Sequence, residues 1–280
     1  MRSEADLVAA EHRNFIGSYR SIARSSPKGG LREGPGLFAF ASGHPLALFN
    51  GCVVTGGVAA DELDAAIGWI RRRYVPFRVW IDVPLDGGGP SAVDRYAAVL
   101  ADHSLVADEH QLPGMVLHPV PEPVPYAPGV TVRSVDPADQ EDFAEHRAVW
   151  AESGLPLEIV VEVISAAFAA DTDVRLFTGY LEDRPVATSI AIRSGDVSGI
   201  YGVGTIEAAR RRGVGTAVTW AAVEAGRGWG CDTIVLQATE MGLPVYRAMG
   251  FRTVVSYATF AQRRPRVATR EDGVDETPTG

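Results

Sequence analysis

The chain has 280 residues, which is long enough for two ordinary domains or one large one. Its apolar content of 46% and charged content of 22% are typical of a globular protein and exclude a disordered chain. The formal net charge of −9 argues against a nucleic-acid partner, because phosphate neutralisation requires a basic face. An acidic surface would instead attract a cationic amine.

The cysteines and the apolar runs exclude further classes. Cys52 and Cys231 lie far apart, with no Cys-x-x-C pair and no cysteine–histidine cluster, so we expect neither a disulfide framework nor a metal site. No uncharged apolar run approaches ~20 residues, and no apolar N-terminal segment indicates secretion. We therefore expect a cytoplasmic protein without a membrane partner.

The first half of the chain predicts the order helix, two strands, helix, strand, helix. An apolar stripe at helical spacing predicts a helix over residues 4–24, followed by a loop to residue 36. The later elements are expected to be strands at 37–41 and 46–54, a helix around Leu63–Tyr74, a strand at 77–83 and a helix that ends near Asp102.

A proline-rich stretch separates this half from the rest. Six prolines between Pro113 and Gly129 predict an extended, semi-rigid connector. We therefore expect an N-terminal α/β domain at 1–118, a linker at 119–129 and a second domain at 130–262. Residues 263–280 are charged and almost without apolar side chains, which predicts a disordered tail.

The second half begins with a predicted strand at 130–133. Asp136-Pro137 indicates a helix start, because proline is favoured at the first helical position. A second helix is expected over Leu157–Phe168, followed by strands at 174–181 and 186–193 and a last strand that ends near Phe260.

The most informative stretch runs from Ile200 to Phe251. A β-branched run ends at Thr205, and an arginine- and glycine-rich loop leads into an amphipathic helix; the loop residues are Arg210, Arg211, Arg212, Gly213, Val214, Gly215 and Thr216. The first N–H groups of a helix are unpaired and its N-terminal end is positive, so an anion can bind there. Glycine lets the anion approach the backbone, and arginine adds charge. This pattern predicts a pyrophosphate site.

Two other phosphate-binding motifs fail on spacing. A dinucleotide fingerprint requires a third glycine where Glu207 follows Gly202-x-Gly204, and no Gly-Lys-Ser/Thr sequence of a P-loop is present. A kinase or a dehydrogenase is therefore excluded.

Two motifs in order carry a resemblance. The Arg-x-x-Gly-x-Gly sequence from Arg210 to Gly215 and the Tyr-x-x-x-Gly-Phe sequence from Tyr246 to Phe251 resemble the acyl-CoA loop and the last helix of the GNAT superfamily of N-acetyltransferases. The resemblance implies an α/β (α+β) fold with a mixed, mostly antiparallel sheet flanked by helices. It covers the C-terminal half of the chain.

The resemblance also implies roles for individual residues. The main chain of Val203, Gly204 and Thr205 would bind the pantetheine arm of acetyl-CoA, and an N–H group near Val203 would face the thioester oxygen. The N–H groups of residues 211–216 would bind the pyrophosphate. Tyr246 would protonate the departing CoA thiolate, and the helices from Trp150 to Phe168 would form one wall of the acceptor site.

Some positions depart from the family pattern. Thr239 and Gly242 stand where the family commonly has asparagine and alanine. The general base is unassigned, because Glu207 and Glu240 are loop carboxylates of the kind that solvent usually covers. The sequence therefore predicts the cofactor contacts better than the proton transfer.

The first half has the same element order and could be a smaller, degenerate copy of the same fold. Its corresponding loop, Thr55–Ala59, lacks the arginines and the Gly-x-Gly sequence. A copy of this kind would have lost the cofactor site. It would then pack against the second half, shape the substrate cleft or form a homodimer.

Two functions follow from this reading. The first is an acetyl-CoA-dependent N-acetyltransferase that moves acetyl to a primary amine by direct attack in a ternary complex, with acetyl-CoA as co-substrate and no metal. The sequence does not decide whether the acetyl acceptor is a small amine or a lysine or N-terminus of a protein. The alternative is a non-catalytic sensor or scaffold that binds acyl-CoA on a GNAT-like fold.

Overall fold

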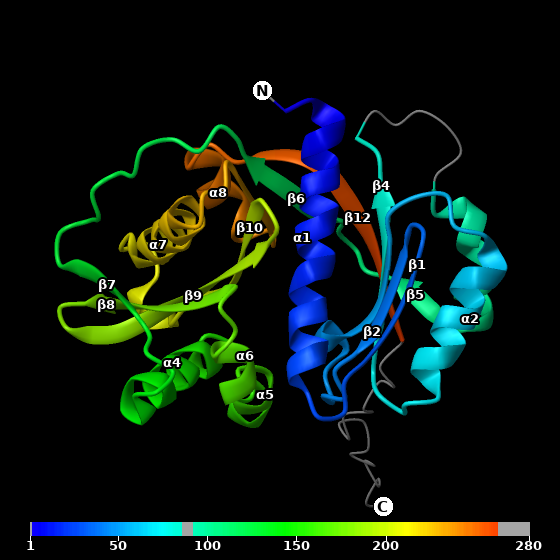
Figure 1. Ribbon diagram of the computed structural model, residues 1–280, viewed down its shortest axis with the longest axis horizontal. Helices are drawn as coiled ribbons and strands as arrows, with labels where there is room; N and C mark the ends of the chain where they lie inside the picture. The colour runs from blue at the N-terminus through cyan, green and yellow to red at the C-terminus, as the bar shows by residue number, and fades with distance from the viewer. Residues whose placement is uncertain (1, 86–91, 263–280) are drawn as a thin grey trace, which may run out of the picture.

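One continuous sheet runs through both halves of the chain (Figure 1). The structure, a computed structural model, describes residues 2–85 and 92–262. Within these residues the strands are β1 (Gly30–Gly34), β2 (Leu37–Ala41), β3 (Asn50–Val54), β4 (Arg78–Val83), β5 (Leu105–Ala107), β6 (Leu112–Leu117), β7 (Val130–Ser134), β8 (Val174–Leu181), β9 (Arg184–Ser194), β10 (Val197–Thr205), β11 (Thr233–Gln237) and β12 (Arg252–Gln262).

Helices flank this sheet. The α-helices are α1 (Glu4–Ser25), α2 (Ala60–Arg71), α3 (Ala97–Asp102), α4 (Gln140–Glu152), α5 (Leu157–Val163), α6 (Ala166–Ala169), α7 (Val214–Gly228) and α8 (Leu243–Ala248). Three short 3₁₀ helices are η1 (Ala47–Phe49), η2 (Asp94–Tyr96) and η3 (Glu207–Ala209).

Each half uses the same local topology. In the first half β1, β2 and β3 are antiparallel, and α2 connects β3 to the parallel strand β4. In the second half β7 to β10 are antiparallel, and α7 connects β10 to the parallel strand β11. The predicted fold class, a mixed and mostly antiparallel sheet with flanking helices, is therefore confirmed.

The two halves exchange strands at the centre of the sheet. The strand order is β1-β2-β3-β4-β12-β6-β11-β10-β9-β8-β7, with β5 also paired to β12. Thus β6, from the first half, pairs with β11, and β12, from the end of the second half, pairs with β4. The exchanged strands also pair with each other. Neither half completes its own sheet.

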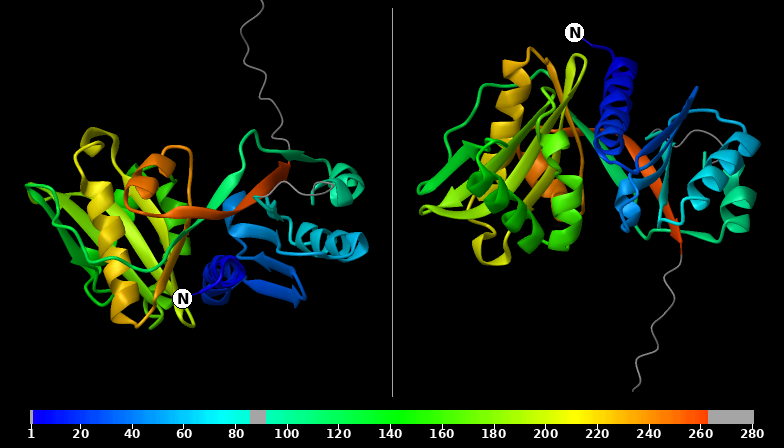
Figure 2. Two further views of the ribbon diagram at one scale, coloured as in Figure 1. Left: turned by 90° about the horizontal axis from the view of Figure 1, so that it is seen from above. Right: turned by 60° about the horizontal axis from the view of Figure 1, so that its bottom comes forward.

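The helix α1 also joins the halves. It confirms the helix predicted at 4–24, and Ser3 caps it by accepting a hydrogen bond from the N–H of Asp6. Buried Asn14 donates from Nδ2 to the carbonyl oxygens of Ile192 (2.9 Å) and Val197 (3.2 Å), which fixes α1 on β9 and β10. Figures 1 and 2 show α1 between the two lobes of the molecule.

Two predictions in the first half are wrong. The expected loop before residue 36 contains strand β1, and the expected strand at 46–49 contains the 3₁₀ helix η1. The cause of the second difference is Asn50, whose buried side chain donates to the carbonyl oxygens of His44, Leu46 and Pro76 and accepts from the N–H of Ser42. The chain wraps around this amide, so the strand begins only at Asn50.

The proline-rich connector begins later than its first proline suggests. Leu112–Leu117 is a central strand, although it contains Pro113. Proline is tolerated here because it lies at the start of β6, where pairing to β11 begins only with Gly114. Residues 118–129 contain no helix or strand.

The helices of the second half also differ from expectation. Helix α4 begins after Asp139, which caps the N–H groups of Glu141 and Asp142, and not at Asp136-Pro137. The helix expected over 157–168 is two short helices, because Ile164 leaves the helical conformation at ψ 62°.

The tail predicted at 263–280 lies outside the described residues. Within the described part of the chain, no helix is both long and apolar enough to cross a membrane.

Candidate active site

Strands β10 and β11 diverge after a short parallel contact. Only Val197–Gly199 pairs with β11, whereas β10 continues to Thr205. On the other side, pairing with β9 is interrupted between Tyr201 and Gly204. Gly202 causes this bulge with a φ of +56°, a conformation that favours glycine. Val203 therefore lies in a stretch of main chain that has no strand partner on either side among the described residues.

The loop after β10 presents its backbone N–H groups at the start of α7. Gly213 is the N-cap of this helix, with a φ of +83°, and a Cβ there would lie 2.9 Å from the Cβ of Ala127. Within the described residues, no backbone carbonyl accepts from the N–H groups of residues 211–216. The structure thus places Val214, Gly215 and Thr216 in the first helical turn, where an anion can bind.

The three arginines of this loop are exposed. Arg212 pairs with Glu182 at 3.3 Å, and Arg210 donates from Nε to the carbonyl oxygen of Thr205 at 3.3 Å. In the part of the chain that the structure describes, Arg211 has no ion-pair partner. Its guanidinium is therefore free to bind an incoming phosphate.

Tyr246 lies on α8, close to the divergent strands. Its ring contacts Phe251 at a centroid distance of 6.0 Å, and burial raises the pKa of its phenol to about 12. The phenol is therefore protonated throughout the neutral pH range. A Cβ at Gly242 would lie 2.7 Å from Cε2 of Tyr246, so the glycine that departs from the family pattern makes room for this ring.

A cavity of about 440 Å³ lies beside the bulge. The second half contributes Trp150, Ser153, Gly154, Leu155, Val163, Ile164, Phe168, Ile190, Ile192, Ile200, Tyr201, Gly202, Val203, Gly204, Gln237, Thr239 and Tyr246. The first half contributes Phe15, Ser18, Tyr19, Ile22, Leu48, Phe49 and Leu112. The bulge, Tyr246 and the helices from Trp150 to Phe168 thus line the same cavity. The resemblance implied that these helices form one wall of the acceptor site.

The contribution of the first half was not predicted for any individual residue. The sequence signal was only the apolar stripe of α1, which is typical of any helix that packs on a sheet. Phe15 and Tyr19 lie more than 120 residues before Trp150, so no local pattern could relate them.

A buried carboxylate lies behind the cavity and was also missed. Glu11 is 0% exposed and accepts hydrogen bonds from Nε2 of Gln237 at 2.7 Å and from the hydroxyl of Tyr257. Burial raises the pKa of Glu11 to about 7, although both hydrogen bonds oppose the increase. Gln237 therefore presents its amide nitrogen to Glu11 and keeps its amide oxygen unpaired within the described residues.

Glu11 should make stability depend on pH. The native state keeps this proton up to pH about 7, whereas the unfolded chain releases it near 4.5, so stability decreases as pH rises through this window. The shift corresponds to about 3 kcal/mol. We expect urea unfolding at pH 5 and pH 8 to show this loss in the wild type relative to Glu11→Gln. Equal pH dependence of the two proteins would contradict the assignment.

The two candidate bases lie outside the cavity. Glu207 is exposed on η3, and Glu240 is exposed and 3.1 Å from Nε2 of His110. Glu240 lines a second cavity of about 770 Å³, which shares Leu48, Leu112, Leu155 and Thr239 with the first. Neither carboxylate therefore lines the cavity that lies beside the bulge.

Comparisons with known proteins agree with this fold. The family described as "Acetyltransferase (GNAT) domain" matches residues 127–240, and no curated protein matches the chain. A GCN5-related N-acetyltransferase from Kribbella flavida is 18% identical with a TM-score of 0.62, covering 94% of this chain and 97% of that one.

Two further solved structures are similar over both halves. A GCN5-related N-acetyltransferase from Sphaerobacter thermophilus is 14% identical with a TM-score of 0.56, covering 93% of each chain. A tandem GNAT protein from the clavulanic acid biosynthesis pathway is 12% identical with a TM-score of 0.58, covering 92% of this chain and 94% of that one. Over residues 127–240, which contain the divergent strands and the arginine loop, the chain thus matches the GNAT acetyltransferase domain, and both halves share the fold of solved GNAT proteins.

Proposed function

We propose that the protein transfers an acetyl group from acetyl-CoA to a primary amine by direct attack in a ternary complex. The observation that carries this proposal is the opening between β10 and β11, which ends at the unpaired N–H groups of α7. An extended arm can pair with the free edge of β10, and a diphosphate can bind the helix N-terminus. Both parts of CoA therefore have a matching surface.

The contacts with acetyl-CoA would come mainly from the main chain. Val203, Gly204 and Thr205 would pair with the pantetheine arm, and the loop from Arg210 to Thr216 would bind the pyrophosphate. The N–H group of Val203 would stabilise the negative oxygen that forms when the amine attacks the thioester. The attacking nitrogen forms the new C–N bond and loses a proton to water, and the C–S bond breaks.

Tyr246 would assist the departure of the thiolate. Its pKa of about 12 exceeds the ~8.5 of a thiol, so full proton transfer would be uphill by about 5 kcal/mol. A hydrogen bond from the phenol to the sulfur costs no such energy and still stabilises the developing charge. We therefore assign Tyr246 as a hydrogen-bond donor to the thiolate.

Replacement of this phenol tests the assignment. In Tyr246→Phe we expect kcat to fall about 10- to 100-fold, because the leaving thiolate loses its donor. The increase in melting temperature caused by acetyl-CoA should remain, because the ring and the main-chain contacts remain. Turnover is measured by release of free thiol and binding by thermal shift.

The control is Tyr74→Phe, because Tyr74 is 94% exposed and does not line the cavity. It should behave as the wild type in both measurements. Unchanged turnover in Tyr246→Phe would remove Tyr246 from the mechanism. If acetyl-CoA neither bound nor lost its acetyl group to any amine, the proposed function itself would be wrong.

A further inference from the structure

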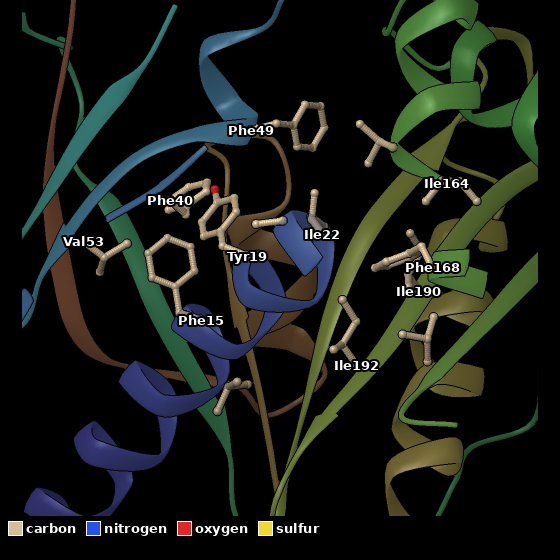
Figure 3. Close-up of a cluster of buried hydrophobic side chains, with 14 of the residues drawn as sticks. Phe15, Tyr19, Ile22, Phe40, Phe49, Val53, Ile164, Phe168, Ile190 and Ile192 are labelled. Atoms are coloured by element: carbon tan, nitrogen blue, oxygen red, sulfur yellow. The ribbon is translucent and has the colours of Figure 1, made fainter. Parts of the chain in front are cut away.

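The 440 Å³ cavity has two apolar walls, one from each half of the chain. Figure 3 shows Ile22 and Phe49 facing Ile164, Phe168, Ile190 and Ile192. Tyr19 lies between Ile22 and Phe40, and its ring stacks on that of Phe40 at a centroid distance of 4.2 Å. These side chains belong to one buried hydrophobic cluster, so the shape of the cavity is set by core packing.

The described lining of this cavity contains no acidic side chain, no lysine, no arginine and no histidine. A cationic or polyhydroxylated group bound there would lose its water without gaining a counter-charge. The charged side chains lie in the neighbouring 770 Å³ cavity, where Arg78 pairs with Asp108 at 2.5 Å and His110 with Glu240 at 3.1 Å. The first cavity therefore selects against charge on the body of a ligand.

Most polar groups of the lining already have protein partners. Ser18 donates to the carbonyl oxygen of Phe15 at 2.8 Å, and Ser153 to that of Trp150 at 2.7 Å. Tyr201 donates to Oδ1 of Asn14 at 2.7 Å. These hydroxyl groups cannot donate to a ligand without breaking an internal hydrogen bond.

The polar groups that remain free lie at one end. Among the described residues, the hydroxyl protons of Thr239 and Tyr246, the indole N–H of Trp150 and the amide oxygen of Gln237 have no hydrogen-bond partner. Gln237 is held in this orientation by Glu11, which accepts from its Nε2 at 2.7 Å. Gln237 lies on β11, Tyr246 on α8 and Thr239 between them, and the ring of Trp150 lies 3.4 Å from the Cβ position of Gly202 at the bulge. A ligand would thus place its polar end at the bulge and its apolar body between the walls.

We propose, on the basis of the acetyltransferase function above, that this cavity binds the acceptor and that the acceptor is a primary amine with an aromatic or branched aliphatic body. The amine reaches the thioester beside Val203, and the amide oxygen of Gln237 accepts a hydrogen bond from its nitrogen. The body packs between Phe49 and Phe168. A volume of about 440 Å³ is in the range of small-molecule sites.

The test compares acceptors at saturating acetyl-CoA, with release of free thiol as the readout. Phenethylamine and isoamylamine represent the proposed class, glucosamine and spermidine represent polar and cationic amines, and a lysine-containing peptide represents a protein acceptor. We expect kcat/KM to be at least about 100-fold higher for the first two. Binding of phenethylamine to the enzyme with CoA, measured by calorimetry, does not depend on turnover.

A charge introduced at the rim makes the test specific to the cavity. Leu48 is 40% exposed and lines both cavities, so Leu48→Asp should fold. We expect it to lower kcat/KM for phenethylamine by at least about 10-fold and to leave the acetyl-CoA thermal shift unchanged. Leu155→Asp, at the rim of the second half, should act in the same way. The matched control is Leu85→Asp, which is 54% exposed and outside both linings.

The possible outcomes separate this inference from the proposed function. Preference for glucosamine, spermidine or the peptide, with acetyl-CoA still bound, would reject the proposed class of acceptor. The proposed acetyltransferase function would remain. Faster reaction with octanoyl-CoA, independent of the amine body, would show that the cavity holds an acyl chain and would also overturn the inference. Preference for the apolar amines, with loss in Leu48→Asp and Leu155→Asp but not in Leu85→Asp, supports it. Absence of an acetyl-CoA thermal shift would reject the proposed function itself.

Discussion

Cutting the chain between Pro123 and Val124 is expected to give two fragments that fold only together. The first fragment contains β6, which completes the second half, and the second contains β12, which completes the first. Without its exchanged strand, each fragment exposes an unpaired central edge, at β4 or at β11. Each fragment alone should lack a cooperative melting transition, and co-expression should restore one complex.

Size-exclusion chromatography and thermal unfolding followed by circular dichroism measure this result. The control pairs residues 1–123 with residues 124–250, a fragment that lacks β12. This pair should not form a folded complex, because β4, β5 and β6 all lose their pairing with β12 at the centre of the sheet. Cooperative unfolding of either single fragment would show that the exchanged strands are dispensable.

Replacing Gly215 by glutamate should abolish acetyl-CoA binding. A Cβ at this position lies 3.1 Å from Oγ1 of Thr205, so the new carboxylate would occupy the region between the end of β10 and the start of α7. That region is where we propose the pyrophosphate binds, and two anions cannot share it. The thermal shift caused by acetyl-CoA should disappear, and kcat/KM should fall by at least about 100-fold.

The fold should survive this change. A carboxylate at a helix N-terminus is favourable, and glycine is a poor helix former, so the melting temperature without ligand should not decrease. Gly228→Glu is the control, because Gly228 lies at the other end of α7 with open space at its Cβ position. Binding of acetyl-CoA retained in Gly215→Glu would contradict a pyrophosphate site in this loop.

Expectations that depended on nearby residues agree best with the structure. The helix at 4–24, the strand before the arginine loop and the helix after it follow from spacing over a few turns, and all three are present. The predicted start of α4 at Asp136-Pro137 was wrong, because the helix begins after Asp139, whose side chain accepts hydrogen bonds from the first N–H groups of the helix. The strand predicted at Leu46–Phe49 was wrong for a different reason. The apolar pattern indicated a strand, but hydrogen bonds from the side chain of Asn50 to the carbonyl oxygens of His44 and Leu46 fix a turn there.

The strand at β6 shows where the sequence is insufficient. Leu112–Leu117 lies in a proline-rich stretch, and its pairing partners are more than 110 residues later in the chain. A strand that is short, contains proline and pairs only at long range has little local signal. The same limit applies to Glu11, whose buried environment comes from Gln237 and Tyr257.

The sequence by itself determined the loop and helix that we propose for binding CoA, because a helix N-terminus, its glycines and its arginines are all local features. Only the tertiary structure decided that strands are exchanged between the halves, and that Phe15, Tyr19 and Phe49 share a cavity with Ile164 and Phe168. The physical reason is that a cavity is the space left when distant elements pack, so its shape and polarity depend on contacts that no local pattern encodes.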